Sequence, residues 1–396
     1  NSRHFSSTIF VNLSKIKIVE NSKKILLVYY KLFKPGGVAK VLTNLANSLS
    51  EEGYTVEILL MMEEKEHFYP LNSDVKVHNI DTFSHWAWKI CEFNVKYLRF
   101  VPKIRNINAY IYHIGVFLML RNWMRKNHQN YDKIISSFYK LTSFLSLNKL
   151  VNYKTICWEN VDYNIGGFLY KGLLRKYYRN INCIVCTNRQ AVTYYEQFNK
   201  TYLITNMIGS PFEDHQEISI PQKENKITYV GRLDKEKNVI ELLEIIKNTS
   251  ISDQWLLQII GDGPEIDNLQ NFVKINFLAK KVTFLGVKSP EEIHHILLKS
   301  KIFAFTSLKE GLPTVLIEAM FCGNVLVSYD CNYGPSDIIT EKNGFLIPLH
   351  DQKKFCEKLE LLTSNSNLIN DLMLSSFEES KAWKKNEILK KWNIIL

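Results

Sequence analysis

The segment KEGLPTVLIEAMFCG, residues 309–323, carries two glutamates, Glu310 and Glu318, that bracket seven residues. The preceding run KIFAFTS is apolar and aromatic enough to predict a buried strand. Pro313 suits the first position of a helix, because it lacks only an N–H group that would be unpaired there. Gly323 fits just past the end of that helix. The segment therefore predicts a strand, a loop carrying Glu310, and a helix carrying Glu318.

The mouth of such a strand–loop–helix unit favours anions. Free N–H groups and the positive end of the helix dipole lie there. Glu310 and Glu318 could then hold hydroxyl groups on either side of a bound phosphate. The alternative is a surface glutamate on a loop and a helix glutamate that caps or pairs with a lysine. The spacing alone does not decide between these two interpretations.

Strands and helices alternate along the chain on both sides of a linker. The 396 residues suggest two domains at ~150 residues each. Apolar runs separated by helical patterns predict parallel βαβ construction, an α/β fold. Two such domains leave a cleft where ligands approach the carboxyl ends of the strands. We expect an N-terminal appendage at residues 1–20, a first domain at 21–208, a linker at 209–224 and a second domain at 225–377.

The cysteines and the length of the apolar runs indicate the cellular compartment in which the protein folds. The seven cysteines show no disulfide framework, which favours a reducing cytosol. Cys183 and Cys186 form a lone CxxC inside a predicted strand, and without a second pair a zinc site is not expected. No apolar run reaches the ~18–20 residues of a spanning helix. The first twenty residues contain no convincing signal peptide, so we treat them as an appendage.

The charge is concentrated in the first half of the chain. Residues 1–200 contain 28 Lys and Arg against 14 Asp and Glu, whereas residues 201–396 contain 22 against 26. The segments 86–126 and 166–180 interleave these cations with aromatic residues, which suits an anionic membrane surface. The same composition could bind nucleic acid, although no recognition motif is present. Alternatively the aromatics are core and the cations form a solvated helix face.

Loops of the second domain repeat one theme. YVGRLDKEKN, residues 229–238, places Arg232 just after a strand and Lys237 at a helix start, where the two could clamp a diphosphate. IIGDGPE and FLGVK follow their strands with Gly261 and Gly286, which allow close backbone approach.

Together with KEGLPTVLIEAMFCG and YGPSDIITEKNGFLIP, these motifs resemble the retaining glycosyltransferases of family 4. The resemblance runs from Lys226 to about Leu362, and Gly36 and Gly37 after the first strand fit it too. It implies the GT-B fold, in which two Rossmann-like domains face across a cleft. It also implies that the C-terminal domain holds a nucleotide-sugar and that a C-terminal helix, about 378–396, crosses back onto the first domain. The stripe of Trp383, Ile388, Leu389 and Trp392 predicts that helix.

The resemblance also assigns roles. Arg232 and Lys237 would bind the donor diphosphate and stabilise the leaving nucleotide, where negative charge develops. Glu310 would contact the transferred sugar, and Glu318 the ribose hydroxyls. The remaining donor-binding positions would be Gly36, Gly37, Gly261, Val287, Gly311, Leu312, Pro313 and Thr314. No metal and no further cofactor are expected, because the cations neutralise the diphosphate.

Four positions depart from the family pattern. Asn160, which we include with Glu310, Arg232 and Lys237 as catalytic, stands where a histidine is frequent. It can still donate a hydrogen bond, but it cannot act as a cation. Asn238 replaces a preferred glycine, Ala39 a frequent glutamate after the GG pair, and Asp337 a common glutamate. None of these departures removes a phosphate ligand.

The resulting hypothesis is a retaining, metal-independent hexosyltransferase. It would move a hexose or N-acetylhexosamine from a nucleoside-diphosphate sugar, UDP favoured, to a lipid-linked saccharide in bacterial surface polysaccharide or lipopolysaccharide synthesis. It would act at the inner face of the cytoplasmic membrane. One alternative is a non-catalytic sugar-nucleotide-binding partner of another transferase. A GT-B sugar-nucleotide epimerase ranks behind, because such proteins lack the EGLPTVLIEA pattern. The sequence identifies neither the sugar nor the oligomeric state.

Overall fold

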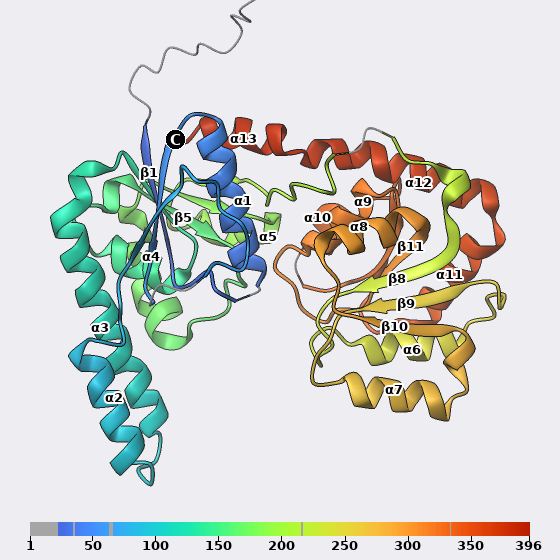
Figure 1. Ribbon diagram of the computed structural model, residues 1–396, viewed down its shortest axis with the longest axis horizontal. Coiled ribbons are helices and arrows are strands. Elements are labelled where there is room, and N and C mark those ends of the chain that lie inside the picture. The colour runs from blue at the N-terminus through green and yellow to red at the C-terminus, as the bar shows by residue number, and fades with distance from the viewer. Residues whose placement is uncertain (1–22, 35, 63–65, 215–216, 333) are drawn as a thin grey trace, which may run out of the picture.

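The protein contains two parallel-sheet Rossmann-like domains, seen side by side in the computed structural model in Figure 1. The structure describes residues 23–34, 36–62, 66–214, 217–332 and 334–396, so the predicted appendage at 1–20 lies outside the described residues. The predicted GT-B class is confirmed by this architecture and by the structural neighbours described below.

The first sheet has seven strands in the order β3-β2-β1-β4-β5-β6-β7, and every neighbouring pair is parallel. Its strands are β1 (Lys24–Tyr29), β2 (Thr55–Leu60), β3 (Lys76–Asn79), β4 (Lys133–Ser136), β5 (Thr155–Glu159), β6 (Cys183–Cys186) and β7 (Thr201–Leu203). Its helices are α1 (Gly37–Glu51), α2 (Trp86–Tyr97), α3 (Ile104–Asn127), α4 (Tyr139–Ser146) and α5 (Arg189–Tyr195). The central strands are continuous apolar runs because helices cover both faces of a parallel sheet.

The second sheet has six parallel strands in the order β10-β9-β8-β11-β12-β13. They are β8 (Glu224–Val230), β9 (Leu256–Ile260), β10 (Val282–Gly286), β11 (Ser300–Phe305), β12 (Val325–Asp330) and β13 (Gly344–Pro348). The helices of this domain are α6 (Val239–Asn248), α7 (Ile266–Ile275), α8 (Pro290–Lys299), α9 (Thr314–Phe321), α10 (Pro335–Ile338), α11 (Gln352–Ser364) and α12 (Ser366–Ser380). The last helix, α13 (Lys385–Asn393), packs on the first domain. The edge strand β13 was not predicted.

The C-terminal segment runs from the second domain back to the first, as the red ribbon in Figure 1 shows. Ile388, Leu389 and Trp392 of α13 lie in the same buried cluster as the apolar residues of β1 and α1. Trp383 was predicted to share their stripe, and this is wrong. It packs against the core of the second domain, because Lys384 is extended (φ −60°, ψ 146°) and ends the helical path before α13 begins.

Residues 86–127 form a helical hairpin, α2 and α3, that projects from the first domain (Figure 1). Many of its aromatic residues are exposed, including Phe93 (57%) and Phe100 (78%). The second basic-aromatic segment, 166–180, is surface only in part. Arg175, one of the cations of this segment, is buried and lies over the rings of Tyr194 and Tyr195.

Replacing Trp392 with alanine should lower the free energy of unfolding by about 3–5 kcal/mol, the cost of emptying a large buried site. Trp392 is 1% exposed, and its ring meets that of Trp158 edge to face at 5.4 Å. Urea unfolding followed by fluorescence measures the loss. Trp86→Ala is the control, because Trp86 is half exposed on the hairpin and should change stability by under about 1 kcal/mol. Equal effects of the two variants would contradict the packing role of α13.

Candidate functional site

The second sheet reverses its strand order between β8 and β11. From β8 the chain proceeds outward through β9 and β10, and then returns to the other side of β8 as β11. The carboxyl ends of all six parallel strands lie at one edge, and a reversal there leaves a crevice between two loops. The loops in question are residues 231–238 and 306–313, which contain the predicted Arg232, Lys237, Glu310 and Gly311.

Lys237 and Glu310 meet in this crevice. The Lys237 ammonium lies 2.5 Å from Glu310 Oε1. The two loops are also joined by one backbone and one side-chain hydrogen bond. Leu308 N–H donates to Glu236 C=O at 2.8 Å, and the Thr306 hydroxyl donates to Asn238 C=O at 3.1 Å. Lys237, predicted to bind the diphosphate, and Glu310, predicted to contact the sugar, are therefore in direct contact.

Arg232 lies on the same loop and is held by Asp234, whose carboxylate pairs with its guanidinium. The Arg232 side chain is 68% exposed, so it remains open to a ligand. Asp234 also accepts a hydrogen bond from Lys237 N–H at 3.0 Å and so fixes the turn between the two cations. Tyr229 donates to Arg232 C=O, and burial together with the charges of Glu310 and Asp234 raises its pKa well above the usual value. Because the hydroxyl of Tyr229 stays protonated, it continues to donate its hydrogen bond to Arg232 C=O.

Asn238 adopts a left-handed conformation, with φ 50° and ψ 42°, immediately before α6. Glycine is the residue best suited to such angles, and asparagine is among the next best. The departure from the family's glycine is therefore compatible with the same turn, and Lys237 keeps its position.

The loop at Gly311 faces the first domain. Asn188 Nδ2 donates to Gly311 C=O at 3.3 Å, and a Cβ added to Gly311 would lie 3.3 Å from Asn160 C=O. Asn160, predicted as catalytic, is thus brought against the loop of Glu310. Its Nδ2 donates to Trp158 C=O at 3.4 Å, whereas its buried Oδ1 has no hydrogen-bond partner among the described residues.

Pro313 was predicted as the first helical residue, and this is wrong by one position. Its ψ of 91° is not helical, and α9 begins at Thr314. The loop of Gly311 and Pro313 packs closely against Gly334, which has no side chain. A Cβ on Gly334 would lie 2.5 Å from Pro313 Cδ and 2.7 Å from Gly311 C=O. Leu312 lies between them and packs against the core of the second domain.

Glu318 does not lie free at the mouth of α9. Its Oε1 accepts from Lys40 Nζ of α1 at 2.8 Å, so this ion pair joins the two domains. Burial lowers the pKa of the Lys40 ammonium, but the charge of Glu318 and the hydrogen bond to it outweigh burial and raise the pKa overall. Glu318 therefore pairs with a lysine, which was the alternative interpretation from the sequence. The lysine, Lys40, belongs to the other domain.

Four other predicted positions follow strands, two of them in the second sheet and two in the first. Gly261 has φ 136°, and a Cβ on it would collide with Gly231 C=O at 1.9 Å, so its glycine serves the neighbouring loop. Val287 follows β10 and is 74% exposed. Gly36 and Gly37 begin α1, and nothing lies within 4 Å of a Cβ on either.

Sequence reasoning missed several residues at the domain boundary. Asn188 and Lys40 were not singled out, although Lys40 directly follows the Ala39 departure. Arg189 was missed too, and it meets the predicted Asp337: its N–H donates to Asp337 Oδ2 at 3.1 Å. Lys309 pairs with Asp162 of the first domain at 2.9 Å. These contacts depend on how the two domains pack against each other, which the sequence does not reveal. The one available signal was that several of these residues lie next to a predicted motif residue.

The described residues contain no group of three or more His, Cys, Asp and Glu side chains placed to hold a metal ion. Cys183 and Cys186 are buried in β6, as predicted for a strand. Burial raises the pKa of the Cys183 thiol to about 11. None of the helices within the described ranges combines the length and apolar character that crossing a membrane requires.

The chain is similar in sequence to known glycosyltransferases. Residues 211–386 match the family described as Glycosyl transferases group 1. A relative from Campylobacter jejuni is 25% identical over 366 residues, spanning 90% of this chain and 94% of its own length. It is named GalNAc-alpha-(1->4)-GalNAc-alpha-(1->3)-diNAcBac-PP-undecaprenol alpha-1,4-N-acetyl-D-galactosaminyltransferase.

Two solved structures show the same fold. One is the apo form of the lipopolysaccharide outer core galactosyltransferase WaaB, with a TM-score of 0.72, 17% identity, and coverage of 94% of this chain and 98% of its own. The other is HepE from Anabaena in complex with UDP and glucose, with a TM-score of 0.69, 15% identity and the same coverage of 94% and 98%.

Lys40→Met should lower the free energy of unfolding by about 1–3 kcal/mol, because it leaves the largely buried Glu318 carboxylate without its partner. The Glu318 side chain is 7% exposed. In a double-mutant cycle with Glu318→Gln, thermal unfolding should give a coupling of about 1 kcal/mol or more. Lys381→Met is the control, since Lys381 pairs with Glu378 on the surface and should cost under about 1 kcal/mol. Additive effects of the first two variants would show that the domain-joining pair contributes nothing.

Proposed function

We propose that this chain, whose residues 211–386 match the family described as Glycosyl transferases group 1, is a retaining, metal-independent glycosyltransferase. It takes a hexose or N-acetylhexosamine from a nucleoside-diphosphate sugar, UDP favoured, and adds it to a lipid-linked saccharide. The observation that carries the proposal is the meeting of Lys237 and Glu310 at the strand-order reversal, 2.5 Å apart. A cation and a carboxylate there suit a diphosphate and the sugar attached to it.

The reaction breaks the bond between the anomeric carbon and the diphosphate oxygen and forms one to an acceptor hydroxyl oxygen. Negative charge develops on the departing phosphate, where Arg232 and Lys237 stabilise it as charge-assisted donors. The acceptor hydroxyl loses its proton, and the departing phosphate oxygen is a base that can receive it. Preorganised cations supply the neutralisation that a divalent metal would otherwise supply.

The carboxylates and amides orient the donor. Glu310 accepts hydrogen bonds from hydroxyls of the transferred sugar. The backbone C=O of Asn160 lies against Gly311 of the same loop, and the side-chain Oδ1 of Asn160, which has no partner among the described residues, is an acceptor for a further hydroxyl. Glu318 accepts from the ribose hydroxyls. Since Lys40 already donates to Glu318 Oε1, the ribose must share that carboxylate with Lys40 or displace it.

Membrane attachment at the cytoplasmic face is supported by the hairpin of α2 and α3. Its exposed aromatics alternate with Lys89, Lys96, Arg99, Lys103 and Arg105, and it projects from the rest of the first domain (Figure 1). Cations beside exposed aromatic residues favour the headgroup layer of anionic membranes. The printed name of the Campylobacter jejuni relative, an acceptor ending in PP-undecaprenol, supports a lipid-linked acceptor.

The donor is tested by thermal unfolding with UDP, GDP, CMP and their common sugars. A donor at ~100 times its Kd should stabilise the protein by ~2.7 kcal/mol, and Glu318→Ala should weaken that effect. Glu357→Ala on α11 is the matched control, because Glu357 is an exposed helix glutamate far from the reversal in sequence. If none of the nucleotides stabilises the wild-type chain, the nucleotide-sugar proposal is wrong.

Catalysis is tested by turnover of the identified donor with a lipid-linked saccharide acceptor. Lys237→Met should lower kcat by roughly 10²–10³, because a donor to the developing charge is lost. Lys235→Met, an exposed lysine on the same loop, should leave kcat unchanged. NMR should find the anomeric configuration of the donor in the product, and EDTA should not slow the reaction. Nucleotide binding without turnover on any acceptor would favour the non-catalytic binding partner instead.

A further inference from the structure

One face of α3 carries a row of exposed apolar side chains. Ile107, Tyr110, Ile114 and Leu118 are between 39% and 53% exposed. Residues three and four apart lie on the same helix face, so these four form one stripe along successive turns. Continuing the same spacing, the stripe ends in Arg121 and Arg125. An apolar row that ends in two cations has the pattern of a surface for an amphiphile.

An apolar groove lies beside this stripe. It has a volume of about 300 Å³ and is formed between α3, α4 and the segment 169–174. Its walls include Tyr110, Ile114 and Phe117 of α3, Phe144 of α4, and Leu169. Leu147, which follows α4, lines this groove and also the neighbouring pocket, so the two cavities adjoin.

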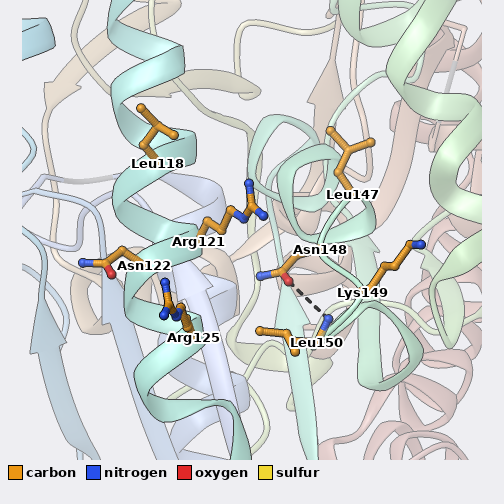
Figure 2. Close-up of a pocket in the computed structure, with 8 residues that line it drawn as sticks. All are labelled: Leu118, Arg121, Asn122, Arg125, Leu147, Asn148, Lys149 and Leu150. Carbon is orange, nitrogen blue, oxygen red and sulfur yellow. Dashed lines mark hydrogen bonds between the residues drawn. The ribbon is translucent and has the colours of Figure 1, made fainter.

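The neighbouring pocket is basic and has a volume of about 580 Å³ (Figure 2). Arg121 and Arg125 line it from α3, one turn apart, and the Arg121 guanidinium is turned toward Asn148. Lys149 also lines it, from the loop after α4, but its ammonium is turned away from α3. No carboxylate lines it, and none of these three cations forms an ion pair with a described residue. Three unpaired cations around one cavity attract an anion.

Asn148 supplies a second, independent indication of an anion. It is 8% exposed, and its Oδ1 accepts from Leu150 N–H at 3.2 Å. Its Nδ2 is buried with no hydrogen-bond partner among the described residues, and it points toward α3 in Figure 2. A buried donor without an acceptor is costly, so an acceptor in the pocket would relieve that cost. The pocket thus offers two guanidinium groups and an amide N–H, all of them donors, and the positive charge of Lys149 lies at its border.

A purely structural role, stabilisation of the end of α3, explains only one of the cations around this pocket. Arg125 lies in the last turn of α3, where cations favour the negative end of the helix dipole. That explanation does not extend to Lys149 on another segment, nor to the unpartnered amide of Asn148. The pocket is also distinct from the donor site, because it belongs to the first domain, whereas the loops of Arg232 and Glu310 belong to the second (Figure 1).

We propose that this pocket binds the phosphate group of a membrane lipid whose apolar chain lies in the adjoining groove. Arg121 and Arg125 bind the phosphate oxygens as forked donors, Lys149 adds a point charge, and Asn148 Nδ2 completes the set. The inference rests on the proposed function in so far as that function brings the first domain to a membrane. It adds a phosphate-specific contact to the general attraction of the basic hairpin.

The test compares vesicles of equal surface charge. The full chain is sedimented with phosphatidylcholine vesicles that contain either phosphatidic acid, with its terminal phosphate, or phosphatidylserine. The basic hairpin attracts both surfaces, whereas the pocket should add a preference for phosphatidic acid of roughly tenfold. Asn148→Asp should abolish this preference, because it keeps the acceptor for Leu150 N–H but places a negative charge against the phosphate. Binding to phosphatidylserine vesicles should remain.

Matched controls separate the pocket from overall charge. Asn365→Asp makes the same charge change at the N-cap of α12, where aspartate caps as well as asparagine, and it should keep the preference. Arg121→Gln with Arg125→Gln, two exposed positions on α3, should lose the preference even if Asn148→Asp does not fold. Arg99→Gln with Lys103→Gln, near the turn of the hairpin, should weaken binding to both vesicles equally.

The inference is overturned if the wild-type chain shows no preference for phosphatidic acid, or if both pocket variants retain it. It is also overturned if soluble pyrophosphate binds in a manner sensitive to Asn148→Asp while the vesicle preference is unchanged, since the site would then serve a soluble anion. UDP stabilisation, measured on the same samples, separates this inference from the proposed function. UDP binding without a phosphatidic acid preference removes only the inference, whereas the reverse result removes only the donor assignment.

Discussion

The reversal of strand order between β8 and β11 is the constraint on which the candidate site depends. It brings the loop after one strand against the loop after another that is some seventy residues away in sequence, and the Lys237–Glu310 ion pair forms where they meet. The hydrogen bonds from Leu308 N–H and the Thr306 hydroxyl hold the two loops together. The sheet therefore positions the two loops from which the charged side chains project, and such preorganisation favours electrostatic stabilisation of a developing charge.

Contacts across the two domains give the site its second wall. Asn188 donates to Gly311 C=O, and Lys40 pairs with Glu318, so the loop and the helix that carry the two glutamates are both tied to the first domain. The C-terminal segment links the domains again, because Trp383 packs in one core and Trp392 in the other. Any relative movement of the domains must therefore change the surroundings of Glu318 directly.

The sequence predicted most of the second domain because its strands are continuous apolar runs followed by motifs at strand ends. β13 escaped prediction because its five residues begin with glycine and end with proline, which reads as a loop. The stripe through Trp383 was misread since helical spacing does not reveal the extended Lys384 that interrupts it. At the site, Glu310 and Lys237 were predictable from motifs, whereas Lys40 was not. Its pairing depends on how α1 of one domain packs against α9 of the other.

The two glutamates of the segment 309–323 pair with lysines of different domains, because one lies on a loop and the other on a helix. Glu310 lies on a loop, and its partner Lys237 belongs to its own domain, so the pair persists when the domains move. Glu318 projects from α9 toward the first domain, and its partner Lys40 belongs to that domain. A ligand that replaces Lys40 at Glu318 removes one tie between the domains, while a ligand at Glu310 removes none. Glu318 therefore meets the first domain directly through Lys40, whereas Glu310 meets it through the neighbours on its own loop, Lys309 and Gly311, which contact Asp162 and Asn188.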